Sequence, residues 1–90
     1  MQRSAAETIA LKALGHLATD GDGLVRFLTI SGLELDDLRS RAGNPELLAG
    51  VIEFLLSDEA LCEGFLAAEN LDSSTLYAAR RALPGAAPDG

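Results

Sequence analysis

Two side chains of the sequence could act as a nucleophile or a general base, and each type occurs once: His16 and Cys62. Nucleophilic catalysis needs the two groups within hydrogen-bond reach and a third group to orient the base. No serine, cysteine or acid lies on the face of the predicted helix that carries His16. The sequence neighbours of Cys62 are acidic, which disfavours a reactive thiolate. We therefore interpret His16 as a residue on the flank of a helix and Cys62 as a small core residue, and we predict no catalytic residues.

The number and spacing of possible ligands exclude the common types of metal site. A structural zinc site needs four ligands, more than one histidine and one cysteine can supply. A di-metal carboxylate bundle needs E-x-x-H, and the residue three before the histidine is Ala13. Asp20–Gly23 resembles the start of a calcium loop, but Leu24 and Ser31 stand where that loop needs oxygen ligands. The sequence predicts no metal and no cofactor.

The residues best suited to an interaction lie near the end of the chain. Tyr77 and Arg81 are spaced i, i+4 on the predicted outer face of the last helix, beside Arg80. Tyrosine and arginine are enriched at interface hot spots. We predict that they form a contact surface that could engage acidic residues, including the Glu59 and Glu63 face of a second copy. The alternative is a local cation–π contact within the helix.

A central helix should position these elements, and Asn44 to Ser57 is the best candidate. Asn44 can accept a backbone N–H at the N-cap, and Pro45 fits the first helical position. At about 100° per residue, the polar or small residues fall on one narrow stripe: Glu46, Gly50, Glu53 and Ser57. The rest of the helix is apolar, which indicates that other helices surround it.

Capping and breaking residues divide the remaining chain into further short helices. The expected N-caps are Ser4 in a capping box with Glu7, Asp20 or Asp22, Glu34, Ser57 or Asp58, and Asp72. The expected ends are Gly32, Gly43 after a helix over about Leu35–Ala42, Asn70, and about Leu83 before Pro84. The expected inward stripes are Ala6, Ile9, Ala10, Ala13, Leu14 and Leu17; Leu24, Phe27 and Leu28; Leu61, Phe65 and Ala68; and Leu76, Ala79 and Leu83.

These elements predict an all-α fold. We expect a compact bundle of five to six short helices around a central buried helix at about 45–57. The bundle should be a single helical domain over residues 4–83, and residues 84–90 should be a flexible C-terminal tail, since Pro84, Gly85 and Pro88 cannot continue a helix.

Charge and composition restrict the partners. The net charge is −7, and no Lys or Arg occurs between Ala42 and Ala79. Nucleic-acid contacts need clustered basic residues, so we expect no nucleic-acid partner. The acidic segment is either a solvated face or a docking surface for a basic partner. No apolar stretch reaches the roughly 20 residues that span a membrane, and a lone cysteine fits a reducing compartment, so we expect a cytoplasmic protein with no membrane contact.

Several runs of the sequence resemble a known family. They are ETIALKALGHLA from Glu7, RFLTISGL from Arg26, DLRSRAG from Asp37, VIEFLLSDEAL from Val51, and ARRAL from Ala79. The sequence resembles a family of short alphaproteobacterial helical proteins catalogued as a domain of unknown function, family 3572. This resemblance implies a cytoplasmic bacterial helical protein and implies no activity. The resemblance leads us to expect a bulkier apolar residue at the position of His16, so it supports no function for this histidine.

These observations favour a non-enzymatic helical domain that acts through a protein partner or by self-association. The alternative is a small-molecule-binding or enzymatic role in a pocket between helices. The first function predicts a compact apolar or Tyr/Arg surface and no deep polar pocket. The second function predicts a cavity with convergent polar groups.

Overall fold

The computed structural model of the chain describes residues 1–19 and 21–84. These residues form six helices and no strand, which confirms the predicted all-α fold. In chain order the helices are α1 (Arg3–Thr19), α2 (Asp22–Ser31), α3 (Leu35–Ser40), α4 (Pro45–Ser57), α5 (Glu59–Glu69) and α6 (Ser73–Ala82).

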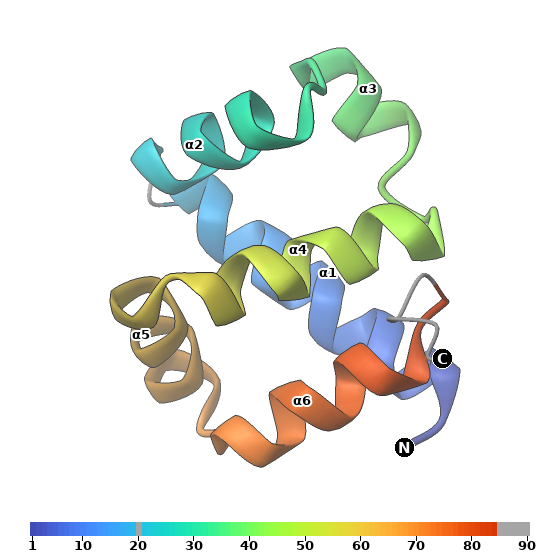
Figure 1. Cartoon of the computed structure of the whole chain (residues 1–90), viewed down its shortest axis with the longest axis vertical. Helices are drawn as coiled ribbons and strands as arrows, with labels where there is room; N and C mark the ends of the chain where they lie inside the picture. Colours follow the sequence, from blue (N-terminus) through green and yellow to red (C-terminus); the bar gives the residue numbers. More distant parts are fainter. Residues whose placement is uncertain (20, 85–90) are drawn as a thin grey trace.

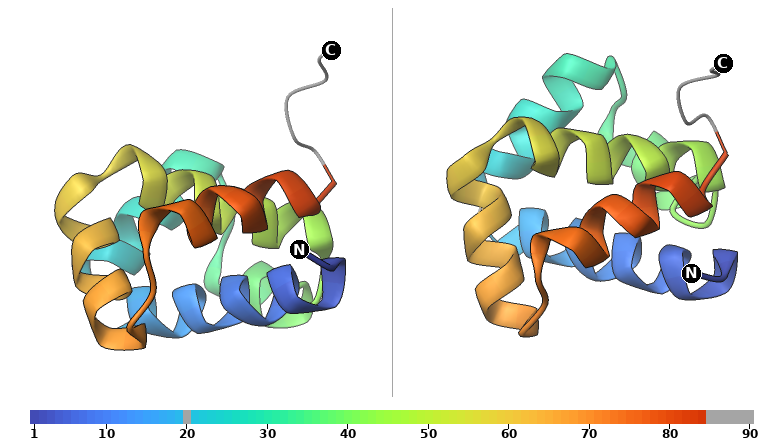
Figure 2. Two further views of the ribbon diagram at one scale, coloured as in Figure 1. Left: turned by 90° about the horizontal axis from the view of Figure 1, so that it is seen from below. Right: turned by 60° about the horizontal axis from the view of Figure 1, so that its bottom comes forward.

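Helix α4 lies at the centre of the bundle and packs against α1, α2, α5 and α6 (Figure 1). The α2–α3 pair lies on one side of α4, and α6 lies on the other. Helix α5 stands across one end of α4 and α6 (Figure 2). The predicted arrangement around a central helix is confirmed.

The sequence of α4 explains its place. The side-chain oxygen of Asn44 accepts hydrogen bonds from the backbone N–H groups of Glu46 (2.8 Å) and Leu47 (3.2 Å), and Pro45 follows at the first helical position, as predicted. The buried residues of α4 are Leu47, Leu48, Ala49, Val51, Ile52, Phe54 and Leu55. Burial on so many sides makes α4 the element on which the rest of the fold packs.

Helix α1 covers one side of α4 with small residues. Ala6, Ala10 and Ala13 are fully buried, and they allow the neighbouring helices to approach closely. The predicted N-cap at Ser4 is wrong, because α1 already begins at Arg3 and Ser4 lies inside it. Glu7 forms an ion pair with Arg3 (3.4 Å) rather than completing a capping box.

The predicted ends of α2 and α5 are confirmed, because each depends on one residue with positive φ. Gly32 ends α2 at φ 75°, and its N–H donates to the carbonyl of Leu28. Asn70 ends α5 at φ 56°. Both residues adopt the left-handed conformation that glycine and asparagine tolerate best.

Two further boundaries and one buried position differ from the prediction. Gly21, not Asp22, stands at the N-cap of α2, and Asp20 lies outside the described residues. Helix α3 ends at Ser40, two residues short of the predicted end, while its N-cap is Glu34 as predicted. Ala68 is exposed, because α5 turns only Phe65 fully into the core.

Helix α6 closes the bundle with the stripe that the sequence predicted. Leu76, Ala79 and Leu83 are buried, and Asp72 stands at the N-cap position. Of the predicted flexible tail, only Pro84 belongs to the described residues, and residues 85–90 lie outside them. Within the described part of the chain, no helix is long and apolar enough to cross a membrane.

Candidate functional site

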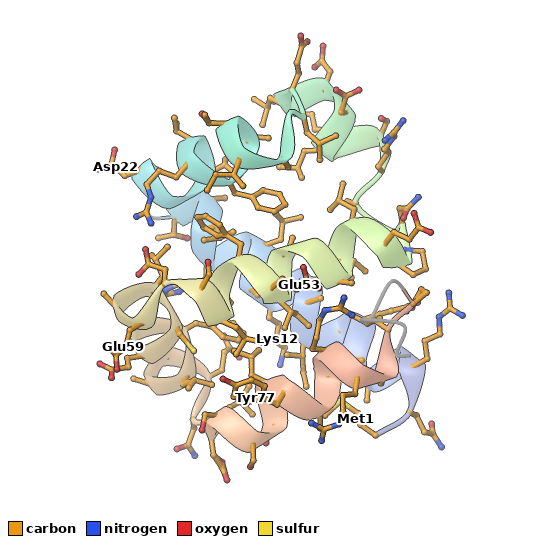
Figure 3. All side chains as sticks on the ribbon, viewed as in Figure 1. Met1, Lys12, Asp22, Glu53, Glu59 and Tyr77 are labelled. Carbon is orange, nitrogen blue, oxygen red and sulfur yellow. The ribbon has the colours of Figure 1, made fainter. Side chains whose placement is uncertain are left out.

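The structure brings only three of the predicted interaction residues into one depression. Tyr77 is 51% exposed, and it lines the same depression as Glu59 and Glu63. Figure 3 shows Tyr77 on α6 and Glu59 on α5. We call this depression the α5–α6 hollow; it measures about 420 Å³, and its lining is Leu56, Glu59, Cys62, Glu63, Leu66, Ser73 and Tyr77. The structure thus brings one aromatic residue and two carboxylates together.

The two arginines of the predicted surface lie elsewhere. The side chain of Arg80 is only 11% exposed, and its guanidinium donates to the carboxylate of Glu53 on α4, with 2.6 Å from Nε to Oε2. Arg80 therefore does not have the exposed position on the outer face of α6 that the sequence predicted. Arg81 is exposed, but it lines a separate shallow hollow with Met1. A cation–π contact is present between two other residues. The guanidinium carbon of Arg26 on α2 lies 5.6 Å from the centre of the Phe54 ring on α4.

Cys62 lies in the α5–α6 hollow with Glu59 and Glu63. Partial burial raises the pKa of the Cys62 thiol, and the carboxylates of Glu63 and Glu59 raise it further. Because the thiolate is the nucleophile, a raised pKa leaves this cysteine unreactive at neutral pH. The interpretation of Cys62 as a packing residue agrees with this environment.

His16 packs as an aromatic ring at the edge of the core. Its imidazole makes an edge-to-face contact with Phe65, at 5.7 Å between ring centres and an interplanar angle of 64°. A Cβ atom added at Gly64 would lie 3.6 Å from the His16 ring. The histidine thus fills space between α1 and α5. Within the described residues, no group of three or more His, Cys, Asp or Glu side chains could hold a metal ion.

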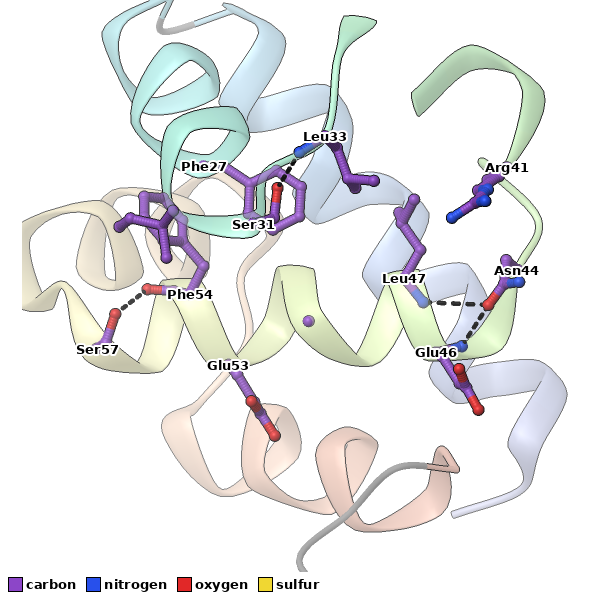
Figure 4. Close-up of a pocket in the computed structure, with 12 residues that line it drawn as sticks. Phe27, Ser31, Leu33, Arg41, Asn44, Glu46, Leu47, Glu53, Phe54 and Ser57 are labelled. Carbon is purple, nitrogen blue, oxygen red and sulfur yellow. Dashed lines mark hydrogen bonds between the residues drawn. The ribbon is translucent and has the colours of Figure 1, made fainter. Parts of the chain in front are cut away.

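A larger depression between α2 and α4 was not predicted from the sequence. It measures about 550 Å³, and we call it the α2–α4 groove (Figure 4). Its lining is Phe27, Ile30, Ser31, Leu33, Arg41, Asn44, Glu46, Leu47, Gly50, Glu53, Phe54 and Ser57. The α4 residues of this lining include the whole stripe that the sequence analysis singled out, Glu46, Gly50, Glu53 and Ser57. That stripe was the available signal, and it was interpreted only as the outward face of α4.

Aromatic rings give the groove its apolar wall. The rings of Phe27 on α2 and Phe54 on α4 meet edge to face, with centres 5.6 Å apart. Phe54 and Leu47 point towards α2, whereas Glu46 and Glu53 point away from it (Figure 4). The apolar side chains therefore face the opening, and the carboxylates lie at its outer rim.

Two residues leave the groove open. Ile30 is 73% exposed although it lines the groove, which makes it the most exposed of the large apolar side chains that the structure describes. A Cβ atom placed on Gly50 would meet no other atom within 4 Å. A helix with a glycine facing open space can be approached closely by another chain.

Four polar side chains of the groove already make hydrogen bonds within the chain. The Ser57 hydroxyl donates to the carbonyl of Phe54 (2.7 Å), and the Ser31 hydroxyl donates to the carbonyl of Leu28 (3.3 Å). The side-chain oxygen of Asn44 caps α4, and the Glu53 carboxylate accepts from Arg80. The contacts of Ser31, Asn44 and Ser57 satisfy backbone groups at helix ends. The charged side chains of Arg41 and Glu46 line the groove beside its apolar residues.

The comparisons with known proteins agree with the resemblance seen in the sequence. The chain belongs to the family described as a protein of unknown function (DUF3572), whose model matches residues 3–86. The chain matches no curated protein and no solved structure. Fold and family are therefore established, and the family description attaches no activity to either depression.

Proposed function

Because the family implies no activity, we propose that this chain is a non-enzymatic protein-interaction domain that binds an apolar segment of a protein in the α2–α4 groove. The observation that carries the proposal is the exposed apolar lining, in which Ile30 is largely exposed and Gly50 faces open space.

The residues that line the groove support a protein partner over a small molecule. Its volume of about 550 Å³ lies within the range of small-ligand pockets, ~300–1,000 Å³. Such pockets also place a few polar groups so that they fix the orientation of the ligand. Here Ser31, Asn44 and Ser57 are engaged in hydrogen bonds with their own backbone neighbours. The groove therefore suits an apolar segment better than a polar metabolite.

The chemistry of the remaining candidates favours a non-enzymatic role. The Cys62 thiol has a raised pKa, and the His16 ring packs on Phe65. We also propose that the protein does not bind nucleic acid, since its net charge is −7. A cytoplasmic location is part of the proposal, because the lone cysteine fits a reducing compartment.

The experiment compares two variants that add the same side chain at two open helical glycines. Gly50→Leu fills the α2–α4 groove, and Gly15→Leu is the matched control, because Gly15 is also helical with no atom within 4 Å of an added Cβ and does not line the groove. We expect the wild type and Gly15→Leu to retain the same proteins from native lysate and Gly50→Leu to lose them. Equal retention by all three proteins would contradict the proposal.

A further inference from the structure

The α2–α4 groove carries an apolar projection on its own wall. Ile30 belongs to α2, lines the groove, and is 73% exposed. Gly50 lies on α4, and the space above it is empty. One face of the chain thus presents both an exposed apolar side chain and an open space in which a side chain of that size could be buried. A face with both features can be self-complementary, as a two-fold interface requires.

The charges around the groove are compatible with a second copy. The charged residues of the lining are Arg41, Glu46 and Glu53, and the Glu53 carboxylate is held by Arg80. What remains is one positive and one negative side chain, Arg41 and Glu46. A two-fold arrangement can place each of these opposite its counterpart in the other copy, which is charge complementarity.

The acidic residues that would repel a second copy lie mainly on other parts of the surface. Glu59 and Glu63 line the α5–α6 hollow, not the groove. Asp58 is ion-paired with Arg26, and Glu69 is ion-paired with Lys12 (3.6 Å). At physiological salt, exposed charges farther apart than about 8 Å are largely screened. A strongly basic partner would be drawn to Glu59 and Glu63, whereas the nearly neutral groove suits a nearly neutral apolar surface.

We propose that the occupant of the α2–α4 groove is a second copy of this chain, with Ile30 of each copy entering the groove of the other over Gly50. This inference rests on the proposed function, because it names the partner that the groove binds. The interface is two-fold symmetric, so each copy contributes one projecting side chain and one groove. No residue of the α5–α6 hollow takes part.

The test uses purified full-length chain and a matched pair of variants on α2. Ile30→Lys places a charge at the proposed contact, and Val25→Lys places the same charge on the same helix at a residue that is 61% exposed and does not line the groove. Both side chains are mostly exposed, so both variants should melt within a few degrees of the wild type. Sedimentation is measured over a concentration series for each protein.

We expect the wild type and Val25→Lys to dimerise with similar dissociation constants. We expect Ile30→Lys and Gly50→Leu to weaken the dimer roughly 30-fold or more, as loss of a hot-spot contact does. A wild type that stays monomeric at millimolar concentration, or equal effects of Ile30→Lys and Val25→Lys, would overturn the second copy as the occupant.

The contact itself is tested by a disulfide between two different chains. One chain carries Ile30→Cys and the other carries Gly50→Cys, both in a Cys62→Ser background because Cys62 is otherwise the only cysteine. Mixing them under mild oxidation should give a cross-linked heterodimer. A control mixture of Val25→Cys with Gly50→Cys should give much less, and equal yields would overturn the geometry.

The outcomes separate this inference from the proposed function. If the wild type is monomeric but Gly50→Leu still loses proteins that Gly15→Leu retains from lysate, the groove binds a different protein and only the second copy is excluded. If Gly50→Leu changes neither self-association nor retention, the groove is not an interaction site and both proposals fail.

Discussion

The two sides of α4 are packed in different ways. On the side of α1, fully buried alanines such as Ala10 and Ala13 let helices approach, and the space is filled. On the side of α2, the rings of Phe27 and Phe54 meet edge to face. Both rings are buried, and the space over Gly50 is open. The size of the side chains between two helices thus decides whether their junction is core or groove.

The largest loss of stability should come from a substitution in the closely packed part of α4. Leu55 is fully buried in α4, so Leu55→Ala should cost about 2–5 kcal/mol. For a domain of this size, the melting temperature should fall by about 8 °C or more in calorimetry. Ile30→Ala on the open side is the control and should change stability by less than about 0.5 kcal/mol. Similar losses for both variants would remove the distinction between the two sides.

The next effect comes from adding volume to the filled side. Ala10 is fully buried, so Ala10→Leu should force its neighbours apart and cost about 1–3 kcal/mol. Chemical denaturation would show the loss as a lower midpoint. Gly50→Leu adds even more side-chain volume, but on the open side of α4, so it should not lower the midpoint of denaturation. A fully tolerated Ala10→Leu would mean that α1 does not pack closely.

The sequence could predict a structural feature when the residues that determine it are close together in the chain. Asn44, Gly32 and Asn70 fix the ends of helices through their own backbone and side-chain chemistry, so these boundaries were predictable. Burial of Arg80 depends on Glu53, 27 residues away on another helix, and no local pattern shows that pair. The exposure of Ala68 depends on how α5 is turned against the core, which its periodicity leaves open.

The groove could not be predicted for a related reason. Phe27 and Phe54 both have the pattern of core residues, and both are buried as expected. The empty space lies beside them and is a property of two helices together. Gly50 was the visible signal, since a glycine inside an otherwise strong helix often has a packing or functional reason.

A smaller effect should appear at Gly50 itself. Gly50→Ala fits without a clash and removes conformational freedom from the unfolded chain, so it should stabilise the protein by roughly 0.5–1 kcal/mol. Urea denaturation would show a higher midpoint with an unchanged slope. A lower midpoint would mean that the space over Gly50 is already occupied.

The smallest effect on stability should come from the ion pair between Arg26 on α2 and Asp58 at the start of α5. The hydrogen bond from Arg26 lowers the pKa of Asp58, and the backbone N–H of Leu61 lowers it further. A carboxyl group with a lowered folded pKa stabilises the fold above its ordinary pKa, and this contribution is lost as pH falls through the lowered value. Asp58→Asn should therefore be less stable than the wild type at pH 7, and in denaturation curves the difference should close as the pH falls through the lowered pKa of Asp58. A difference that stays constant with pH would contradict a role for the carboxylate charge.

Amide chemical shifts over a dilution series test most directly whether the groove is the contact surface. We expect the amide signals of Ile30, Leu33, Gly50 and Phe54 to shift together between millimolar and micromolar concentration. The signals of Tyr77, Glu59 and Glu63 should stay in place. Concentration-dependent shifts confined to Tyr77 and its neighbours in the α5–α6 hollow would contradict the groove as the site and restore the surface that the sequence first suggested.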